Sequence, residues 1–337
     1  MNGKKNPAVV CCRTASMILI VLCHIVSYYS FIPGHQFLPL VFNVGVHSFL
    51  LISGYLYGGK TITDWKSWFY KRWKTVAMPA LCMSIIVLLI TLFSDDRPTP
   101  LSTALYLLNL QGLGFLVPGF YRYFSEITAL GPLWFITVIM LCYCLVPVLQ
   151  KLRSGVCGVR HGVTVTVAAV MAAFAAYWAT GFNTMYFMTF ALGYGMSARG
   201  TLDKGGFFRY ATVSCVMVAA QACRLILRAV IDGSPLYQCY TELSQMTLAI
   251  WILYTFFRLA ELFPDVIGNV AQNSVVSMAD GYSFYIYLTH YCFCAGEWNV
   301  FARTDNLLLA SLLFAAATLT AAVLLKTIVQ SIQLLTK

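Results

Sequence analysis

The feature that most constrains this chain is a succession of long apolar runs separated by short polar segments. A helix that crosses the hydrocarbon core of a bilayer needs about 20 apolar residues. Because 60% of the residues are hydrophobic and only 10% are charged, too little polar surface remains for a water-soluble domain. We therefore predict an all-α, polytopic membrane protein with about ten transmembrane helices, folded as one domain over residues 1–337 with no appended soluble domain. The runs lie near residues 8–30, 37–58, 74–93, 131–150, 162–180, 184–198, 209–230, 241–263, 281–297 and 306–328.

Lysine and arginine lie in short clusters between the apolar runs, and cytoplasmic loops of membrane proteins are enriched in these residues. A cytoplasmic N-terminus leaves only Arg97, Arg122, Arg228 and Arg303 outside, and ten helices then bring both termini to the cytoplasm. The residues placed inside are Lys4, Lys5, Lys60, Lys66, Lys71, Arg72, Lys74, Lys151, Arg153, Arg160, Arg199, Lys204, Arg209, Lys326 and Lys337. Orientation in the membrane, rather than nucleic-acid binding, therefore explains the formal net charge of +10.

The twelve cysteines do not indicate a metal site, because no CxxC pair and no His/Cys cluster has zinc spacing. We expect small buried apolar side chains at Cys23, Cys82, Cys142, Cys144, Cys215, Cys223 and Cys292.

The N-terminal run resembles a signal peptide only in the two lysines before it. Arg13 interrupts the apolar stretch and no small-residue cleavage site follows, so we expect this run to remain as a helix.

The stretch RTASMILIVLCH, residues 13–24, carries an arginine and a histidine at the ends of a lipid-like run. Eleven residues of α-helix turn through about 1100° and rise ~16 Å, so Arg13 and His24 share a face and lie about half the hydrocarbon thickness apart. Ionisable groups inside a bilayer face a protein-lined or wet cavity, which makes them functional candidates. Taken alone, the pattern fits equally well an arginine that snorkels to the interface and a histidine that only packs.

Six stretches follow one another in an order typical of one family. They are Arg-x10-His in the first run, then NVGVHSFLLISGYLYGG, WKSWFYKRWKTVAMP, GPLWFITVIMLCYCLVP, FALGYGM and SFYIYLTH. Together, and over nearly the whole chain, they resemble the membrane acyltransferase 3 family. The resemblance implies a membrane-bound O-acyltransferase of ten helices, in the cell membrane. It implies that the enzyme moves an acyl group, most often acetyl, from cytoplasmic acyl-CoA to a hydroxyl of an extracytoplasmic or lipid-linked saccharide.

The essential arginine and histidine of that family map onto Arg13 and His24, which are the expected catalytic residues. A neutral imidazole suits His24 to take the proton of a sugar hydroxyl as it attacks a thioester. Arg13 is expected to clamp a donor phosphate or polarise the acyl end. The cluster Lys71, Arg72 and Lys74 is expected to bind the polyanionic acyl-CoA, a co-substrate rather than a bound cofactor. A positive-inside anchor explains the same cluster without a ligand.

The second run carries a polar stripe, because Asn43, His47 and Gly54 are spaced i, i+4, i+11, with Ser53 beside them. Asn43 or His47 is a candidate to orient His24, and Ser53 and Gly54 are expected to line a cavity or allow close packing. The family usually has an acidic or other polar residue where His47 stands. This departure leaves the role of His47 open.

Further candidates lie near the outer side and in the ninth run. Ser283, Tyr287 and His290 share one helix face. Two roles are equally expected for His290: it binds the donor or acceptor, or it joins two helices by a hydrogen bond. Trp134 is a candidate to stack on a sugar, although interfacial aromatics also act as anchors. Glu126 is a candidate to support His24 or an acceptor hydroxyl, but its place in the outer loop 94–130 favours a solvated role.

Arg224 and Arg228 lie one turn apart in the run 209–230. Their expected partner is Glu242 or an anionic acceptor.

The alternative function is a transporter or flippase for a lipid-linked saccharide, in which intramembrane Arg and His would serve passage or proton coupling. Such proteins commonly show internal pseudo-symmetry, and none is visible in this sequence.

Overall fold

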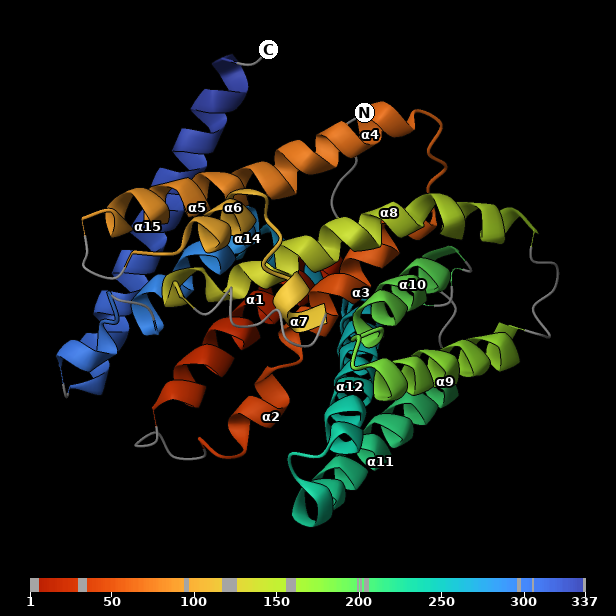
Figure 1. The fold of residues 1–337 in the computed structure, drawn as a ribbon. Coiled ribbons are helices and arrows are strands. Elements are labelled where there is room, and N and C mark those ends of the chain that lie inside the picture. The colour runs from red at the N-terminus through yellow and green to blue at the C-terminus, as the bar shows by residue number, and fades with distance from the viewer. Residues whose placement is uncertain are drawn as a thin grey trace. The chain divides into compact units, whose positions relative to one another are not determined.

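A computed structural model describes residues 6–29, 35–93, 97–116, 126–155, 162–198, 200, 202, 206–295, 298–304 and 306–335. Within these ranges the chain is helical and contains no β-strand (Figure 1), as predicted. Parts of the outer loop 94–130 lie outside the described residues. So do several basic residues used for the orientation, namely Lys4, Lys5, Arg122, Arg160, Arg199, Lys204 and Lys337.

Each predicted apolar run forms a helix where the chain is described. The helices are α1 (Pro7–Tyr28), α2 (Leu38–Phe42), α3 (Gly45–Gly58), α4 (Trp65–Arg72), η1 (Trp73–Ala77), α5 (Met78–Thr91), α6 (Pro100–Leu107), α7 (Leu113–Leu116), η3 (Thr128–Leu133), α8 (Trp134–Gly155), α9 (Gly162–Thr180), α10 (Met185–Ala198), α11 (Phe207–Ile231), α12 (Pro235–Leu262), α13 (Pro264–Gln272), α14 (Ser274–Cys294), η5 (Phe301–Arg303) and α15 (Leu307–Leu335).

Seven stretches of the described chain are long and apolar enough to cross a membrane: α1, α2–α3, α4–α5, η3–α8, α11, α12 and α15. The other three predicted runs form α9, α10 and α14. With 14 residues, α10 rises only ~21 Å, which is shorter than the ~30 Å hydrocarbon core. Length and composition therefore support a membrane protein with seven candidate spans.

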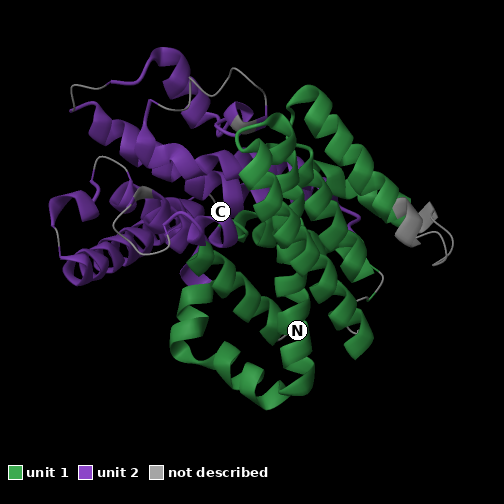
Figure 2. Cartoon of the chain, turned by 90° about the horizontal axis from the view of Figure 1, so that it is seen from below, with its two compact units in different colours: residues 1–19, 43–61, 144–280 green, residues 20–42, 62–143, 281–337 purple. Residues whose placement is uncertain are grey.

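The chain divides into two compact units, coloured separately in Figure 2. Unit 1 comprises Met1–Leu19, Asn43–Thr61 and Cys144–Asp280, and unit 2 comprises Ile20–Phe42, Ile62–Tyr143 and Gly281–Lys337. Each unit is built from three stretches that are distant in sequence. As a result, α1, α8 and α14 each contribute residues to both units.

In unit 1, glycine allows α3 and α10 to pack backbone against backbone. A Cβ added to Gly54 would lie 2.0 Å from the carbonyl oxygen of Phe190, and one added to Gly193 would lie 2.0 Å from that of Leu51. Gly58 is equally close to α10. Only residues without a side chain permit such an approach. Gly54, the glycine of the SGY element, therefore has the predicted packing role.

In unit 2, the helix that carries the basic cluster begins earlier than predicted. It runs from Trp65 through the π-helical turn η1 into α5, so the cluster lies within the helix rather than before it. Pro79 lacks an N–H and would disrupt a regular α-helical ladder. The π turn Trp73–Ala77 lies directly before Met78 and Pro79, and within it Thr75 Oγ1 donates to the carbonyl of Lys71 at 2.8 Å. Gln333 of α15 donates to that of Lys74 at 2.9 Å.

The cysteines follow the prediction in part. Cys23, Cys82, Cys142 and Cys292 are buried, whereas Cys223 is half-buried and Cys144 and Cys215 are exposed. On membrane-length helices, an exposed cysteine is compatible with a lipid-facing position because its side chain is weakly polar. The structure shows no disulfide bond among the cysteines that it describes.

Candidate active site

Three rings from α1 and α14 lie together in unit 2. The ring of His24 has its centre 5.3 Å from that of His290 and 4.8 Å from that of Tyr291, which it meets edge to face. The His290 side chain is completely buried, and His24 is half-buried. The predicted base His24 and the predicted supporting residue His290 are thus neighbours.

The hydrogen-bonding pattern of His290 determines which of its nitrogens carries a proton. Its Nδ1 lies 2.8 Å from the carbonyl oxygen of Tyr287 and 3.2 Å from that of Ile286. Carbonyl oxygens only accept, so Nδ1 must donate. In the neutral ring, Nε2 is then an acceptor. This nitrogen is buried and has no hydrogen-bond partner among the described residues, a rare state for a buried polar atom.

Three contacts hold α14 in place beside this cluster. The hydroxyl of Tyr287 donates to the carbonyl of Pro132 in η3, and its ring meets Phe135 of α8 with centres 5.6 Å apart. Cys292 contacts the carbonyl of Ala129 at 3.6 Å. The GPLWF segment therefore supports the backbone turn that orients His290. The spacing in the sequence predicts only that Tyr287 and His290 share a helix face.

In unit 1, Arg13 forms an ion pair with Asp280 of α14. Arg13 Nε lies 2.6 Å from Oδ1 of Asp280, and Nη2 contacts the same oxygen. The side chain of Asp280 is 1% exposed and that of Arg13 is 26% exposed. The predicted run 281–297 excludes Asp280, whereas α14 already begins at Ser274. A carboxylate inside an otherwise apolar helix is the signal that marks such a residue.

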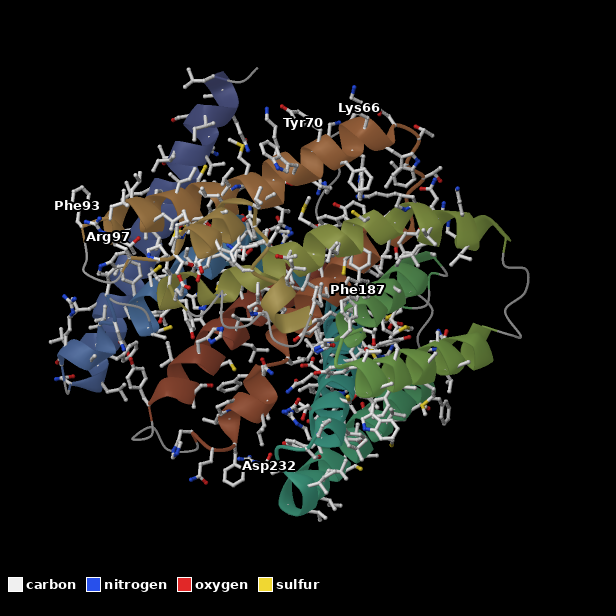
Figure 3. All side chains as sticks on the ribbon, in the orientation of Figure 1. Lys66, Tyr70, Phe93, Arg97, Phe187 and Asp232 are labelled. Atoms are coloured by element: carbon white, nitrogen blue, oxygen red, sulfur yellow. The ribbon has the colours of Figure 1, made fainter. Side chains whose placement is uncertain are left out.

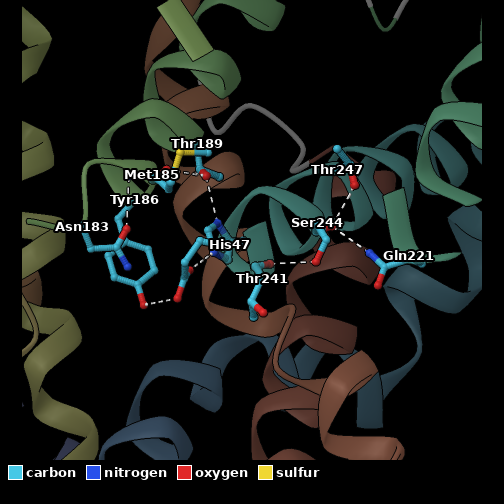
Figure 4. A network of polar contacts seen from close by, with 10 residues as sticks. His47, Asn183, Met185, Tyr186, Thr189, Gln221, Thr241, Ser244 and Thr247 are labelled. Carbon is cyan, nitrogen blue, oxygen red and sulfur yellow. Dashed lines mark hydrogen bonds and ion pairs between the residues drawn. The ribbon is translucent and has the colours of Figure 1, made fainter. Parts of the chain in front are cut away.

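His47 lies at the centre of a buried polar network in unit 1 (Figure 4). Thr189 donates its hydroxyl to the carbonyl of Met185 at 2.8 Å, so its oxygen accepts from His47 Nδ1 at 2.9 Å. His47 Nε2 lies 2.6 Å from Oε2 of Glu242, and Tyr186 donates to Oε1 at 3.4 Å. The bond between His47 and Glu242 must contain one proton. Every polar atom of His47 is thereby satisfied, and α3, α10 and α12 are tied together.

Glu242 interacts with the expected arginine Arg224 and also with His47. Glu242 forms its ion pair with His47, whereas Nε of Arg228 lies 3.9 Å from Asp232 on the same helix. Arg224 is buried in α11 and interacts electrostatically with Glu242, as the sequence predicted. Arg228 and Asp232 form an exposed pair at i, i+4, which contributes little.

Three other candidates from the sequence have positions that bear on their roles. Asn43 is exposed in the turn between α2 and α3, so it does not share a helix with His47 as expected. Ser53 is half-buried in α3. Glu126 is exposed and accepts from the backbone N–H and hydroxyl of Thr99 at 2.8 and 3.2 Å. It therefore fastens the start of α6 within unit 2.

Trp134 opens α8 and is half-buried, with its ring edge-on to Phe135. In the basic cluster of unit 2, Lys71 is exposed and Arg72 and Lys74 are half-buried. Lys74 Nζ lies 5.4 Å from the ring centre of Tyr70, and Tyr70 itself points away from α4 (Figure 3). This surface offers cationic groups from the last turn of α4 and the π turn.

A bundle of membrane-length helices that encloses ionisable side chains is typical of membrane transporters and membrane enzymes. Comparison with known families decides between these classes. The chain matches the acyltransferase domain model over residues 6–327, nearly its whole length. It therefore belongs to the acyltransferase 3 family, as its motifs predicted, and is an acyltransferase. No curated protein and no solved structure matches it.

Proposed function

We propose that the protein transfers an acyl group, most often acetyl, from cytoplasmic acyl-CoA to a hydroxyl of a cell-surface or lipid-linked saccharide. The hydroxyl oxygen attacks the thioester carbonyl, an ester C–O bond forms, and the C–S bond breaks. The proton of the hydroxyl passes to a base and then to the departing thiolate, so CoA leaves as the free thiol. Family membership supports the acyl transfer, and the motifs described above support this choice of donor and acceptor.

His24 is the base in this proposal, and one observation carries the assignment. Its half-buried imidazole is enclosed by two other rings, yet neither ring nitrogen bonds to any residue that the structure describes. A ring with unused nitrogens in a secluded site is available to a substrate hydroxyl. General-base catalysis by such a group contributes roughly 10²–10⁴-fold to a rate.

Arg13 positions the donor. Asp280 compensates its charge and holds one edge of the guanidinium, which leaves further N–H groups for a phosphate or the acyl carbonyl. The cluster Lys71, Arg72 and Lys74 supplies charge for the nucleotide end of acyl-CoA. This division of roles requires a cytoplasmic N-terminus in the plasma membrane. With α9, α10 and α14 added to the seven candidate spans, ten crossings bring both termini inside.

Mass spectrometry of surface glycans and glycolipids tests the proposal. Cells that carry the chain should show saccharides heavier by one acetyl group or a larger acyl, and cells without it should not. Re-expression of the wild-type chain should restore the modification. Unchanged glycans together with a lipid-linked saccharide retained on one leaflet would favour a transporter instead.

A further inference from the structure

His290 has the unusual combination of a fixed tautomer and an unused acceptor. Its Nδ1–H bonds to the backbone carbonyl of Tyr287 one turn earlier, so the ring cannot reverse its roles without losing that bond. Its Nε2 is buried without a partner among the described residues. Burying an unpartnered acceptor costs free energy. An apolar side chain would fill the same volume without that cost.

The group that faces His290 within unit 2 is His24. The two ring centres are 5.3 Å apart and the planes are tilted by 35°. Nitrogens lie on the rims of both rings, so this separation leaves room for one N–H···N bond of about 3 Å after a small rotation. Tyr287 and Tyr291 also contact His290, with ring centres 5.9 and 6.2 Å away. The hydroxyl of Tyr287 is already bonded to Pro132.

We infer that His290 is a positioning residue of the acyl transfer, which accepts a hydrogen bond at Nε2 from one ring nitrogen of His24. This inference rests on the proposed function. The bond selects the tautomer in which the other nitrogen of His24 carries a lone pair toward the saccharide hydroxyl. The carbonyl of Tyr287, His290, His24 and the hydroxyl then form one chain of donors and acceptors. In hydrolase triads, a third group likewise orients the catalytic base through a hydrogen bond.

His290 exchanges no proton in this scheme. During attack, the hydroxyl proton moves to the free nitrogen of His24, and the resulting imidazolium keeps its bond to His290 Nε2. The same proton leaves with the thiolate. His290 thus acts through His24 and contacts neither donor nor acceptor.

Two conservative variants separate this role from a purely structural one. Asn places an amide near the position of Nδ1, so His290→Asn keeps the bond to Tyr287 and removes the acceptor near His24. Gln reaches the position of Nε2, so His290→Gln keeps an acceptor there and loses the bond to the backbone. A structural role predicts that Asn is tolerated better than Gln. The positioning role predicts the reverse.

The assay follows transfer of label from radiolabelled acetyl-CoA to the glycolipid fraction of cells whose glycans the protein modifies. We expect His290→Asn to lower kcat by roughly 100-fold, the low end of what a positioned base contributes, with KM for acetyl-CoA unchanged. His290→Gln should retain more activity than His290→Asn. An Asn variant as active as the Gln variant, or more active, overturns the inference.

Further variants keep the outcome decisive. In a His24→Ala background, adding His290→Asn should cause no additional loss, because His290 acts only through His24. If His290→Asn is not recovered in folded form, His290→Leu replaces it, and transfer at the wild-type rate by that variant overturns the inference. Loss of kcat with KM unchanged supports it. Failure of the wild-type chain to transfer any label would instead reject the proposed function.

Discussion

His47 in unit 1 and His290 in unit 2 are both buried, yet their hydrogen-bonding capacity is used differently. Both nitrogens of His47 have partners, on Thr189 and Glu242. His290 uses one nitrogen for its own helix and leaves the other unused among the described residues. A fully satisfied network holds helices in one arrangement, whereas an unused buried acceptor has a cost that packing does not explain.

The comparison separates residues that resemble one another in sequence. All three histidines of interest, His24, His47 and His290, stand in apolar runs, and each is equally a functional candidate by that criterion. Their partners distinguish them. We therefore expect substitutions at His47 to affect stability and those at His24 to affect acyl transfer.

The largest effect is expected at His24. His24→Ala should leave the protein inserted and folded but reduce acyl transfer by about 10²–10⁴-fold, because the proton acceptor is lost. Transfer of label from acetyl-CoA, normalised to folded protein from size-exclusion chromatography, measures it. Near-normal product from the well-folded variant would show that His24 is not the base. The proposed difference between a structural His47 and a catalytic His24 would then also fail.

The next effect concerns the network around His47. Glu242→Leu should lower the free energy of unfolding by roughly 3–5 kcal/mol, since His47 is left buried without its partner. The double variant His47→Leu, Glu242→Leu should recover part of that loss, because an apolar pair replaces a buried ion pair with little cost, although the buried Arg224 still lacks the Glu242 carboxylate. Thermal unfolding in detergent measures both. A single variant as stable as wild type would show that the network does not hold unit 1 together.

Close packing of α3 on α10 gives a smaller effect. Gly54→Ala inserts a Cβ 2.0 Å from the carbonyl oxygen of Phe190 and should cost about 1–3 kcal/mol of stability through overpacking. Gly195→Ala on α10 is the matched control, because a Cβ there meets nothing within 4 Å. Equal melting temperatures for the two variants would contradict the packing described for unit 1.

Arg13 lies between the two extremes, since it is bonded to Asp280 yet partly exposed. Arg13→Lys keeps the charge and loses the planar fork, so KM for acetyl-CoA should rise by roughly tenfold while the base remains intact. Steady-state transfer at varied acetyl-CoA measures the change. If KM and kcat both stay at wild-type values, the ion pair of Arg13 with Asp280 has a structural role only, like the pair of His47 with Glu242.

Hydropathy located the helices because the membrane imposes a minimum length on each apolar run. The finer errors have local physical causes. The helix expected from residue 74 begins at Trp65, because the π turn Trp73–Ala77 joins α4 to α5 without a break. The stripe that included Asn43 fails because the helix is interrupted before Gly45.

The motifs brought His24 and His290 forward as candidates, but their contact depends on how α1 and α14 pack. The same holds for the pairs Arg13 with Asp280 and His47 with Glu242, whose members are 267 and 195 residues apart in the chain. Spacing within one helix predicts a shared face. It does not predict which distant helix covers that face, so the sequence does not indicate the contacts of Arg13 with Asp280 and of Glu242 with His47.

The separation of Arg13 from Asp280 also bears on how the protein is made. At about 5–20 residues per second, a ribosome needs roughly 13–50 s to reach Asp280 after it has synthesised Arg13. During that interval α1 is inserted with a cation whose final counter-ion does not yet exist. Until Asp280 is synthesised, the long side chain of Arg13 can extend toward the lipid headgroups. Nascent chains halted before residue 280 should therefore hold α1 in the bilayer less firmly than those that have passed it.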